Sequence, residues 1–151
     1  AALRSSNSST EKFDAARAAG AVAAVNGRDA QAAEQIRAAA GGPLYGAVDL
    51  VASADTANLA LAVLRKGGKL IVVGLYGGEI PVSLVVLVQR ALMLQGSNVG
   101  TVAELKELVA LARSGKLKQI PIEKRSLADV SRTLDQLKAG EIRGRVVIEI
   151  P

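Results

Sequence analysis

Three short stretches hold the residues of this sequence that could contact a ligand. Ala52-Ser53, Gly74-Leu75-Tyr76 and Ser97-Asn98-Val99 each directly follow a run of mostly aliphatic residues that predicts a β-strand. Where strands alternate with helices the sheet is parallel, and ligands bind at the carboxyl ends of its strands. The three stretches are therefore candidates for one binding site.

Catalysis and metal binding that need His or Cys are excluded, because the sequence has neither residue. Without them the chain cannot build a His- or Cys-containing triad, a disulfide, a thiolate metal site or an imidazole-held zinc. No acidic cluster suggests a metal site made of carboxylates. We expect no catalytic residue and no metal ligand in this chain.

The composition predicts one domain with an aliphatic core. Half of the 151 residues are hydrophobic but 2% are aromatic, so the core should be rich in Ala and closely packed. The net charge is +5, with the basic residues scattered, and few aromatic residues can stack on bases. We therefore expect neither a nucleic-acid nor a membrane partner. Because no signal peptide or membrane-spanning stretch is recognisable, a cytoplasmic location follows by default.

Helix caps and β-branched runs predict the elements that must position the candidate residues. Capping boxes of the Ser/Thr-x-x-Glu type begin helices at Ser8 and Thr101. The predicted helices cover residues 8–20, 29–41, 53 or 55 to 66, a short turn after 81, 101–115 and 126–140. The predicted strands cover residues 22–25 (a weak one), 47–51, 69–74, 92–96 and 146–150. Gly67-Gly68 is interpreted as a helix C-cap and turn, because no helix begins after it to bind a phosphate.

These alternating elements predict an α/β fold with a parallel sheet and right-handed crossovers. Residues 69–74 are nearly all apolar, which suits a strand buried on both faces. Pro121 marks a break, after which the last part of the chain should pack apart from the main sheet.

Three segments, 64–75, 95–101 and 137–147, resemble the medium-chain dehydrogenase/reductase family, and their order and spacing resemble its zinc-type alcohol dehydrogenases. The resemblance implies a Rossmann-like, doubly wound parallel sheet with flanking helices that binds NAD or NADP. Residues 1–151 would be part of that domain, lacking its first strand and glycine-rich turn, and residues from about 121 would form its C-terminal return segment. The zinc ligands and most of the substrate pocket would lie in a missing N-terminal catalytic portion.

The resemblance also implies a role for each candidate residue. Asn7 stands where the family often has an acidic residue that binds the adenosine ribose and repels a 2′-phosphate. Asn7 gives no such repulsion, and Ser8 could donate to a phosphate, so both NAD and NADP remain open. Alternatively, Asn7 is a turn residue and Ser8 an N-cap.

The three strand-end stretches would line the cofactor. Ala52-Ser53 would let the dinucleotide approach the backbone, although Ser53 is alternatively a helix N-cap. Gly74-Leu75-Tyr76 and Ser97-Asn98-Val99 would lie beside the nicotinamide, although the first is alternatively a tight turn. Arg145 would bind the pyrophosphate through its guanidinium, or else is a surface residue.

The parent enzyme implied by the resemblance transfers hydride between an alcohol or carbonyl compound and NAD(P), with zinc held outside this chain. This chain alone is expected to be inactive. The alternative is a non-catalytic fragment or binding module, and a methyltransferase of similar fold is disfavoured by the Gly144-Arg145 ending. Expected partners are the dinucleotide, the missing portion and further copies of the chain, because a sheet without its first strand exposes unpaired edges. Nothing in the sequence names the alcohol.

Overall fold

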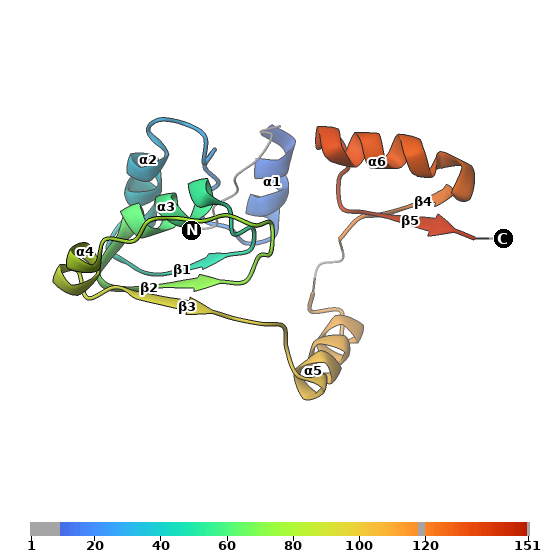
Figure 1. Cartoon of the computed structure of the whole chain (residues 1–151). Helices are drawn as coiled ribbons and strands as arrows, with labels where there is room; N and C mark the ends of the chain where they lie inside the picture. Colours follow the sequence, from blue (N-terminus) through green and yellow to red (C-terminus); the bar gives the residue numbers. More distant parts are fainter. Residues whose placement is uncertain (1–9, 118–119, 151) are drawn as a thin grey trace. The chain divides into compact units, whose positions relative to one another are not determined.

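The computed structural model describes residues 10–117 and 120–150. The chain divides into two compact units, Ala1–Val99 and Gly100–Pro151. Figure 1 shows the helices and strands of both units.

A parallel sheet of three strands is the centre of the first unit (Figure 1). Its order is β1-β2-β3, with β1 at Leu44–Asp49, β2 at Leu64–Val72 and β3 at Met93–Gly96. Helix α3 (Ala54–Val63) connects β1 to β2, and the short helix α4 (Leu84–Gln89) lies between β2 and β3. The parallel α/β arrangement expected from the sequence is confirmed.

Two buried clusters hold α3 between the sheet and its neighbouring helix. Helices α1 (Thr10–Ala18) and α2 (Ala32–Ala40) precede the sheet. One cluster contains Ile36 of α2 and Val63 of α3, and the other contains Ala60 of α3 and Leu70 of β2. Small alanine side chains let α3 approach the sheet closely, which leaves Leu70 with 0% of its surface exposed.

The weak strand predicted at residues 22–25 is wrong, because the structure assigns no strand there and forms a single bridge at Asn26. Val25 instead joins the buried cluster around Ile36. Two consecutive Ala residues, which have low β-propensity, interrupt this run. Val25 is the one residue of the run that is buried.

The interpretation of Gly67-Gly68 as a helix C-cap is also wrong. Helix α3 is capped by Leu64, and both glycines lie inside β2 where its pairing with β1 is irregular, between Leu44 and Gly46. Gly67 has a φ of +75°, and its N–H donates to the carbonyl of Arg90 at 2.8 Å. The glycines therefore allow an irregularity in the strand rather than ending a helix.

The second unit contains a strand that the sequence did not predict. Strand β4 (Ile122–Ser126) pairs in parallel with β5 (Arg145–Glu149), and Ile122 is opposite Arg145. The three-residue helix η1 (Leu127–Asp129) and helix α6 (Val130–Ala139) connect them. Three consecutive charged residues in β4 hide the β-pattern, since charged residues are uncommon in strands.

One side chain, Arg125, ties β4 to α6. Its guanidinium donates two hydrogen bonds to the Glu123 carboxylate, at 2.7 and 3.0 Å. It also donates to the hydroxyl of Thr133 at 2.9 Å and to the side-chain oxygen of Gln136 at 2.6 Å. The Arg125 side chain is 13% exposed, so its charge is largely shielded from water and is compensated by these four hydrogen bonds.

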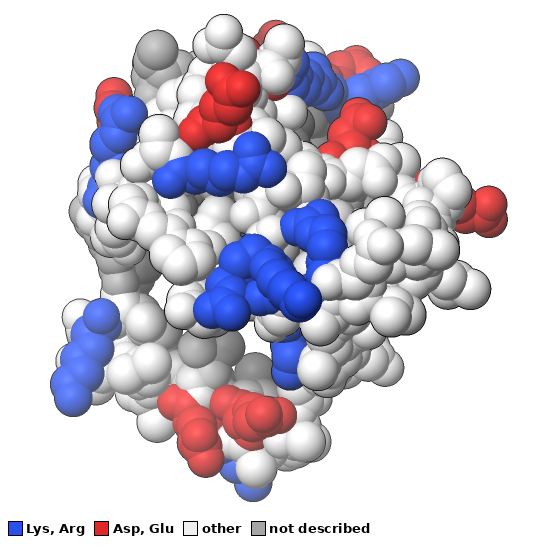
Figure 2. All heavy atoms as spheres, turned by 90° about the vertical axis from the view of Figure 1, so that its left-hand side faces the viewer, with Lys and Arg blue, Asp and Glu red and all other residues white. Residues whose placement is uncertain are grey.

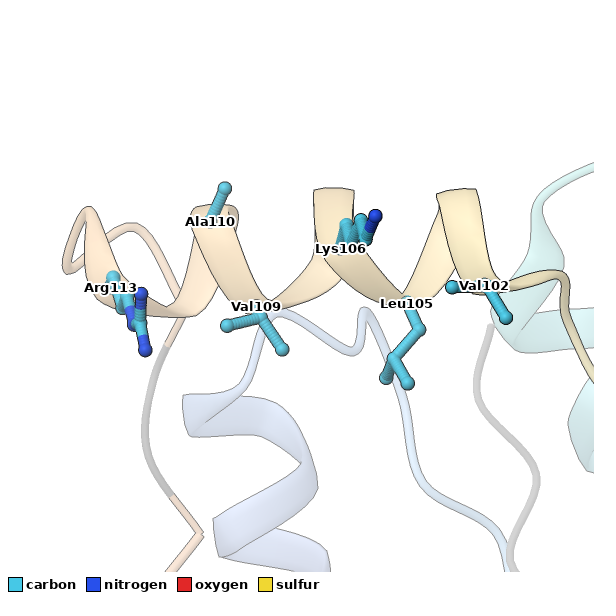
Figure 3. A pocket seen from close by; sticks show the side chains of 6 residues that line it. All are labelled: Val102, Leu105, Lys106, Val109, Ala110 and Arg113. Atoms are coloured by element: carbon cyan, nitrogen blue, oxygen red, sulfur yellow. The ribbon is translucent and has the colours of Figure 1, made fainter.

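Helix α5 (Val102–Arg113) begins with the capping box predicted at Thr101, whose hydroxyl accepts a hydrogen bond from the Glu104 amide. Six side chains of this helix line a shallow surface hollow (Figure 3). They are Val102, Leu105, Lys106, Val109, Ala110 and Arg113. Across residues 10–117 and 120–150, every helix is too short or too polar to cross a lipid bilayer.

Acid is expected to destabilise the second unit. The hydrogen bond from Arg125 holds the pKa of Glu123 below its ordinary value of 4.5. A carboxyl group whose pKa is lowered by folding stabilises the folded state above its unfolded pKa, and this contribution is lost as the pH falls through the folded value. The urea midpoint followed by NMR signals of α6 should therefore fall as the pH drops below the ordinary pKa of Glu.

In the Glu123→Gln variant this fall should be smaller, although not abolished, because the hydrogen bond from Ser126 also lowers the pKa of Asp129. Glu141→Gln is the matched control, since Glu141 forms no ion pair within the described residues. An identical pH dependence in Glu123→Gln and the unsubstituted protein would contradict this interpretation.

Candidate functional site

The three strands of the first unit end side by side, which brings the predicted strand-end stretches together. Asp49 of β1 is opposite Val72 of β2, and Val72 is opposite Gly96 of β3. The chain leaves each strand toward the same edge of the sheet (Figure 1). This carboxyl edge is where parallel α/β sheets bind their ligands.

The buried carboxylate of Asp49 organises the turn that follows β1. Asp49 is 6% exposed. Its Oδ1 accepts hydrogen bonds from the backbone amides of Val51 and Ala52, both at 2.9 Å. Its Oδ2 accepts one from the hydroxyl of Thr56 at 2.8 Å. One side chain thus fixes the turn and the first turn of α3 together.

The same residue joins the turn after β1 to the turn after β2. The backbone carbonyl of Asp49 accepts hydrogen bonds from the amides of Val73 at 2.8 Å and Gly74 at 3.1 Å. The amide of Tyr76 donates to the carbonyl of Val51 at 3.0 Å. The edge therefore continues as a bonded backbone surface beyond the last residues of the strands.

The third strand joins this surface through one further bond. The amide of Ser97 donates to the carbonyl of Val72 at 2.9 Å. The stretches that begin at Ala52, Gly74 and Ser97 therefore form one continuous edge, as the sequence predicted.

Gly74 is required by a very close backbone approach. A Cβ atom at this position would lie 2.2 Å from the carbonyl carbon of Val51, a distance that no side chain tolerates. Gly78 is similarly close, with a Cβ position 2.8 Å from the amide nitrogen of Ala54. The segment at Gly74 therefore packs directly on the turn after β1, while the tight turn considered for Gly74 is not assigned at residues 73–75.

Ala52 stands in the left-handed region, with a φ of +63°. This conformation costs an L-residue roughly 1–2 kcal/mol. The hydrogen bond from its amide to Asp49 offsets that cost, and such strained residues tend to occur at ligand sites.

Ser53 is confirmed as the N-cap of α3. Its hydroxyl accepts a hydrogen bond from the amide of Thr56 at 3.2 Å, and the Thr56 hydroxyl accepts one from the amide of Ser53 at 3.1 Å. A cofactor role for Ser53 would be additional to this cap and stays a prediction.

The residues that follow the edge expose large apolar side chains. Leu75, Tyr76 and Val99 are 95%, 80% and 87% exposed. Adjacent exposed apolar side chains often indicate a binding surface, whereas single ones do not. The edge therefore offers apolar surface beside backbone amides.

For the remaining predicted residues, a contact with this edge stays a prediction. Asn7 and Ser8 lie outside the described residues. Arg145 lies in the second unit at the start of β5, and its exposed guanidinium donates to the carbonyl of Gly144 at 3.1 Å. Its predicted pyrophosphate contact stays a prediction.

Two residues of the site, Asp49 and Thr56, were missed in the sequence. A signal was present, because an acidic residue inside the otherwise apolar run of residues 47–51 needs hydrogen-bond partners once buried. Within the described residues, no group of three or more Asp or Glu side chains could hold a metal ion.

Comparisons of the sequence with known proteins all find dehydrogenases. Residues 5–114 match the family model described as "Zinc-binding dehydrogenase". The chain is 33% identical over 139 residues to an alcohol dehydrogenase of Moraxella sp. (strain TAE123), covering 92% of this chain and 40% of that protein. It is also 33% identical over 140 residues to an alcohol dehydrogenase of Geobacillus stearothermophilus, covering 93% and 41%.

A solved structure is similar over nearly the whole chain. The alcohol dehydrogenase from Aeropyrum pernix superposes with a TM-score of 0.82 at 32% identity, covering 99% of this chain and 42% of that one. The chain thus spans about 40% of the length of the curated relatives that it matches.

Gly74→Ala is expected to destabilise the first unit by about 2–3 kcal/mol, the scale of a core forced to accept extra volume. Gly96→Ala is the matched control, because its added methyl group would have nothing within 4 Å. It should change the free energy of unfolding by less than about 1 kcal/mol. Urea unfolding followed by NMR signals of β1 and β2 measures both, and equal effects would contradict the close approach.

Proposed function

Because the chain belongs to the zinc-binding dehydrogenase family, we propose that the carboxyl edge of β1, β2 and β3 binds the nicotinamide half of NAD or NADP. In the enzyme to which this edge contributes, hydride passes between an alcohol or carbonyl compound and the cofactor. The observation that carries the proposal is the continuous bonded surface formed by the three strand-end stretches.

Hydrogen-bonding groups at this edge support a carboxamide ligand. Within the described residues, the backbones of Leu75, Asn98 and Val99 form no hydrogen bond. The side-chain amide of Asn98 likewise has no partner there. A carboxamide both donates and accepts hydrogen bonds, so it matches a row of backbone amides and carbonyls.

Apolar side chains at the same edge support a flat ring. Leu75 and Val99 are exposed beside these backbone groups, and burial of apolar surface against a ring is favourable at about 25 cal/mol per Å². Because Gly74 packs closely on Val51, the segments after β1 and β2 are in direct backbone contact. A ligand can thereby reach the backbone of both turns.

When bound, the nicotinamide supplies the hydride-transfer chemistry. The residues of this chain hold and orient the ring, and Leu75 and Val99 keep water from one side of it. Zinc is a different case, because the chain has no His, no Cys and, in its described residues, no carboxylate cluster. The residues present do not fit a zinc site.

Contacts with the other half of the dinucleotide belong to the same proposal but rest on the sequence. Asn7 and Ser8 would contact the adenosine ribose and a 2′-phosphate, and Arg145 the pyrophosphate. A chain that engages the cofactor through one part of the site should bind it weakly.

Titration with the two halves of the cofactor tests the proposal. Nicotinamide mononucleotide should shift the amide NMR signals of residues 52–53, 74–76 and 97–99, with a dissociation constant in about the millimolar range. AMP should leave these signals unchanged, since it carries the phosphate and ribose without the nicotinamide.

The Gly74→Ala variant should lose the response to nicotinamide mononucleotide, whereas Gly96→Ala should keep it. Equal shifts with AMP and nicotinamide mononucleotide, or shifts that avoid all three stretches, would refute a nicotinamide site at this edge.

A further inference from the structure

The amino end of the same sheet carries a group of basic side chains that the proposed function does not use. We call it the basic end; it consists of Arg37, Arg65, Lys66, Lys69 and Arg90. Figure 2 faces this end, and Lys and Arg side chains gather in the middle of the view.

Two hydrogen bonds and one cation–π contact place three of these residues around the end of α3 and the start of β2. Arg37 donates to the carbonyl of Ala62 at 2.6 Å, and Arg90 donates to the carbonyl of Leu64. Arg65 lies with its guanidinium carbon 4.4 Å from the centre of the Tyr45 ring. Cations beside the last carbonyls of a helix are favourable, which explains why the group is stable.

These contacts are made with neutral groups, so they do not neutralise the positive charges. No residue of the basic end forms an ion pair within the described part of the chain. Arg37 and Arg65 each use one guanidinium nitrogen in a hydrogen bond, and both residues are exposed. Their other N–H groups remain available as donors.

Between residues 41 and 90 the charges are segregated between the two ends of the sheet, whereas α2 carries both Glu34 and Arg37. From residue 41 to residue 90 the acidic residues are Asp49, Asp55 and Glu79. Asp49 ends β1, Asp55 is in the first turn of α3, and Glu79 follows the Gly74 turn. All three therefore belong to the carboxyl edge, and the cations of the same segment belong to the opposite end.

We propose that the basic end binds an acidic segment of a partner protein. Like charges gathered without counterions repel one another, and such a surface attracts a partner of opposite charge and speeds its association. The rigid fork of Arg binds carboxylates through two bonds, whereas Lys adds a mobile point charge. The mixture of both suits several carboxylates spaced along a peptide.

A nucleic acid fits this surface less well. Tyr45 is an aromatic residue beside the basic end, and Arg65 already covers its ring. Binding of single strands uses successive aromatic side chains on which bases stack. The other aromatic residues, Phe13 and Tyr76, lie in α1 and in the turn after β2.

Fluorescence anisotropy with a fluorescein-labelled decaglutamate peptide at low ionic strength tests the proposal. The peptide should bind saturably, and the double variant Arg65→Glu/Lys66→Glu should weaken binding by about tenfold or more, as expected for paired charge reversals. The control Lys106→Glu/Arg113→Glu changes the net charge equally without altering the basic end, so it should weaken binding by less than about threefold if the basic end, rather than the net charge, binds the peptide.

The neutral variant Arg65→Gln/Lys66→Gln, whose fold is checked by circular dichroism, should show a smaller loss than the charge reversal. Three outcomes would overturn the proposal. They are no saturable binding, equal losses in the two reversed variants, and tighter binding of a single-stranded oligonucleotide than of the peptide through the same residues.

Discussion

The candidate site depends on one buried carboxylate, that of Asp49. Its three accepted hydrogen bonds hold the turn after β1, including Ala52 in a backbone conformation that is unfavourable for an L-residue. Hydrogen bonds to a charged acceptor contribute about 1.5–3 kcal/mol each, enough to offset that strain. The turn so fixed is the surface on which the Gly74 turn packs. Loss of the carboxylate would therefore disturb both turns.

The turn fixed by Asp49 positions the rest of the edge through close backbone packing. Gly74 lets the second turn come within contact of Val51, and the Tyr76 amide bonds to the Val51 carbonyl. Leu75, between these two contacts, presents its side chain to solvent. The exposed apolar residues are thus held by neighbours that cannot move independently, which is the preorganisation that a ligand site requires.

Sequence patterns between neighbouring residues predicted much of the fold. The elements that were not predicted depend on contacts between residues far apart in the sequence. The Thr101 capping box and the Ser53 cap depend on residues three positions apart, so the sequence shows them directly. Strand β4 is stabilised by pairing with β5, more than 20 residues away, and its charged residues hide it. The Gly67-Gly68 pair was misassigned because its role depends on pairing with β1.

The candidate site was likewise predictable in one part and not in another. The convergence of the three strand-end stretches follows from a general rule of parallel sheets and was predicted. The role of Asp49 was not, because it needs Thr56 in reach and burial beneath the turn. Arg145 was chosen by family resemblance, and its surroundings in the described structure are those of its own strand.

Hydrogen exchange in two Asp49 variants tests the central claim most directly. Asp49→Asn can accept from the Val51 and Ala52 amides through its oxygen and donate to Thr56, whereas Asp49→Ala can do neither. In Asp49→Ala, exchange of the Tyr76 amide should accelerate by about tenfold or more, because it bonds to the turn that Asp49 holds. In Asp49→Asn, which keeps these hydrogen bonds without the negative charge, the acceleration should be smaller than in Asp49→Ala. Unchanged protection of Tyr76 in Asp49→Ala would contradict the claim that this carboxylate holds both turns.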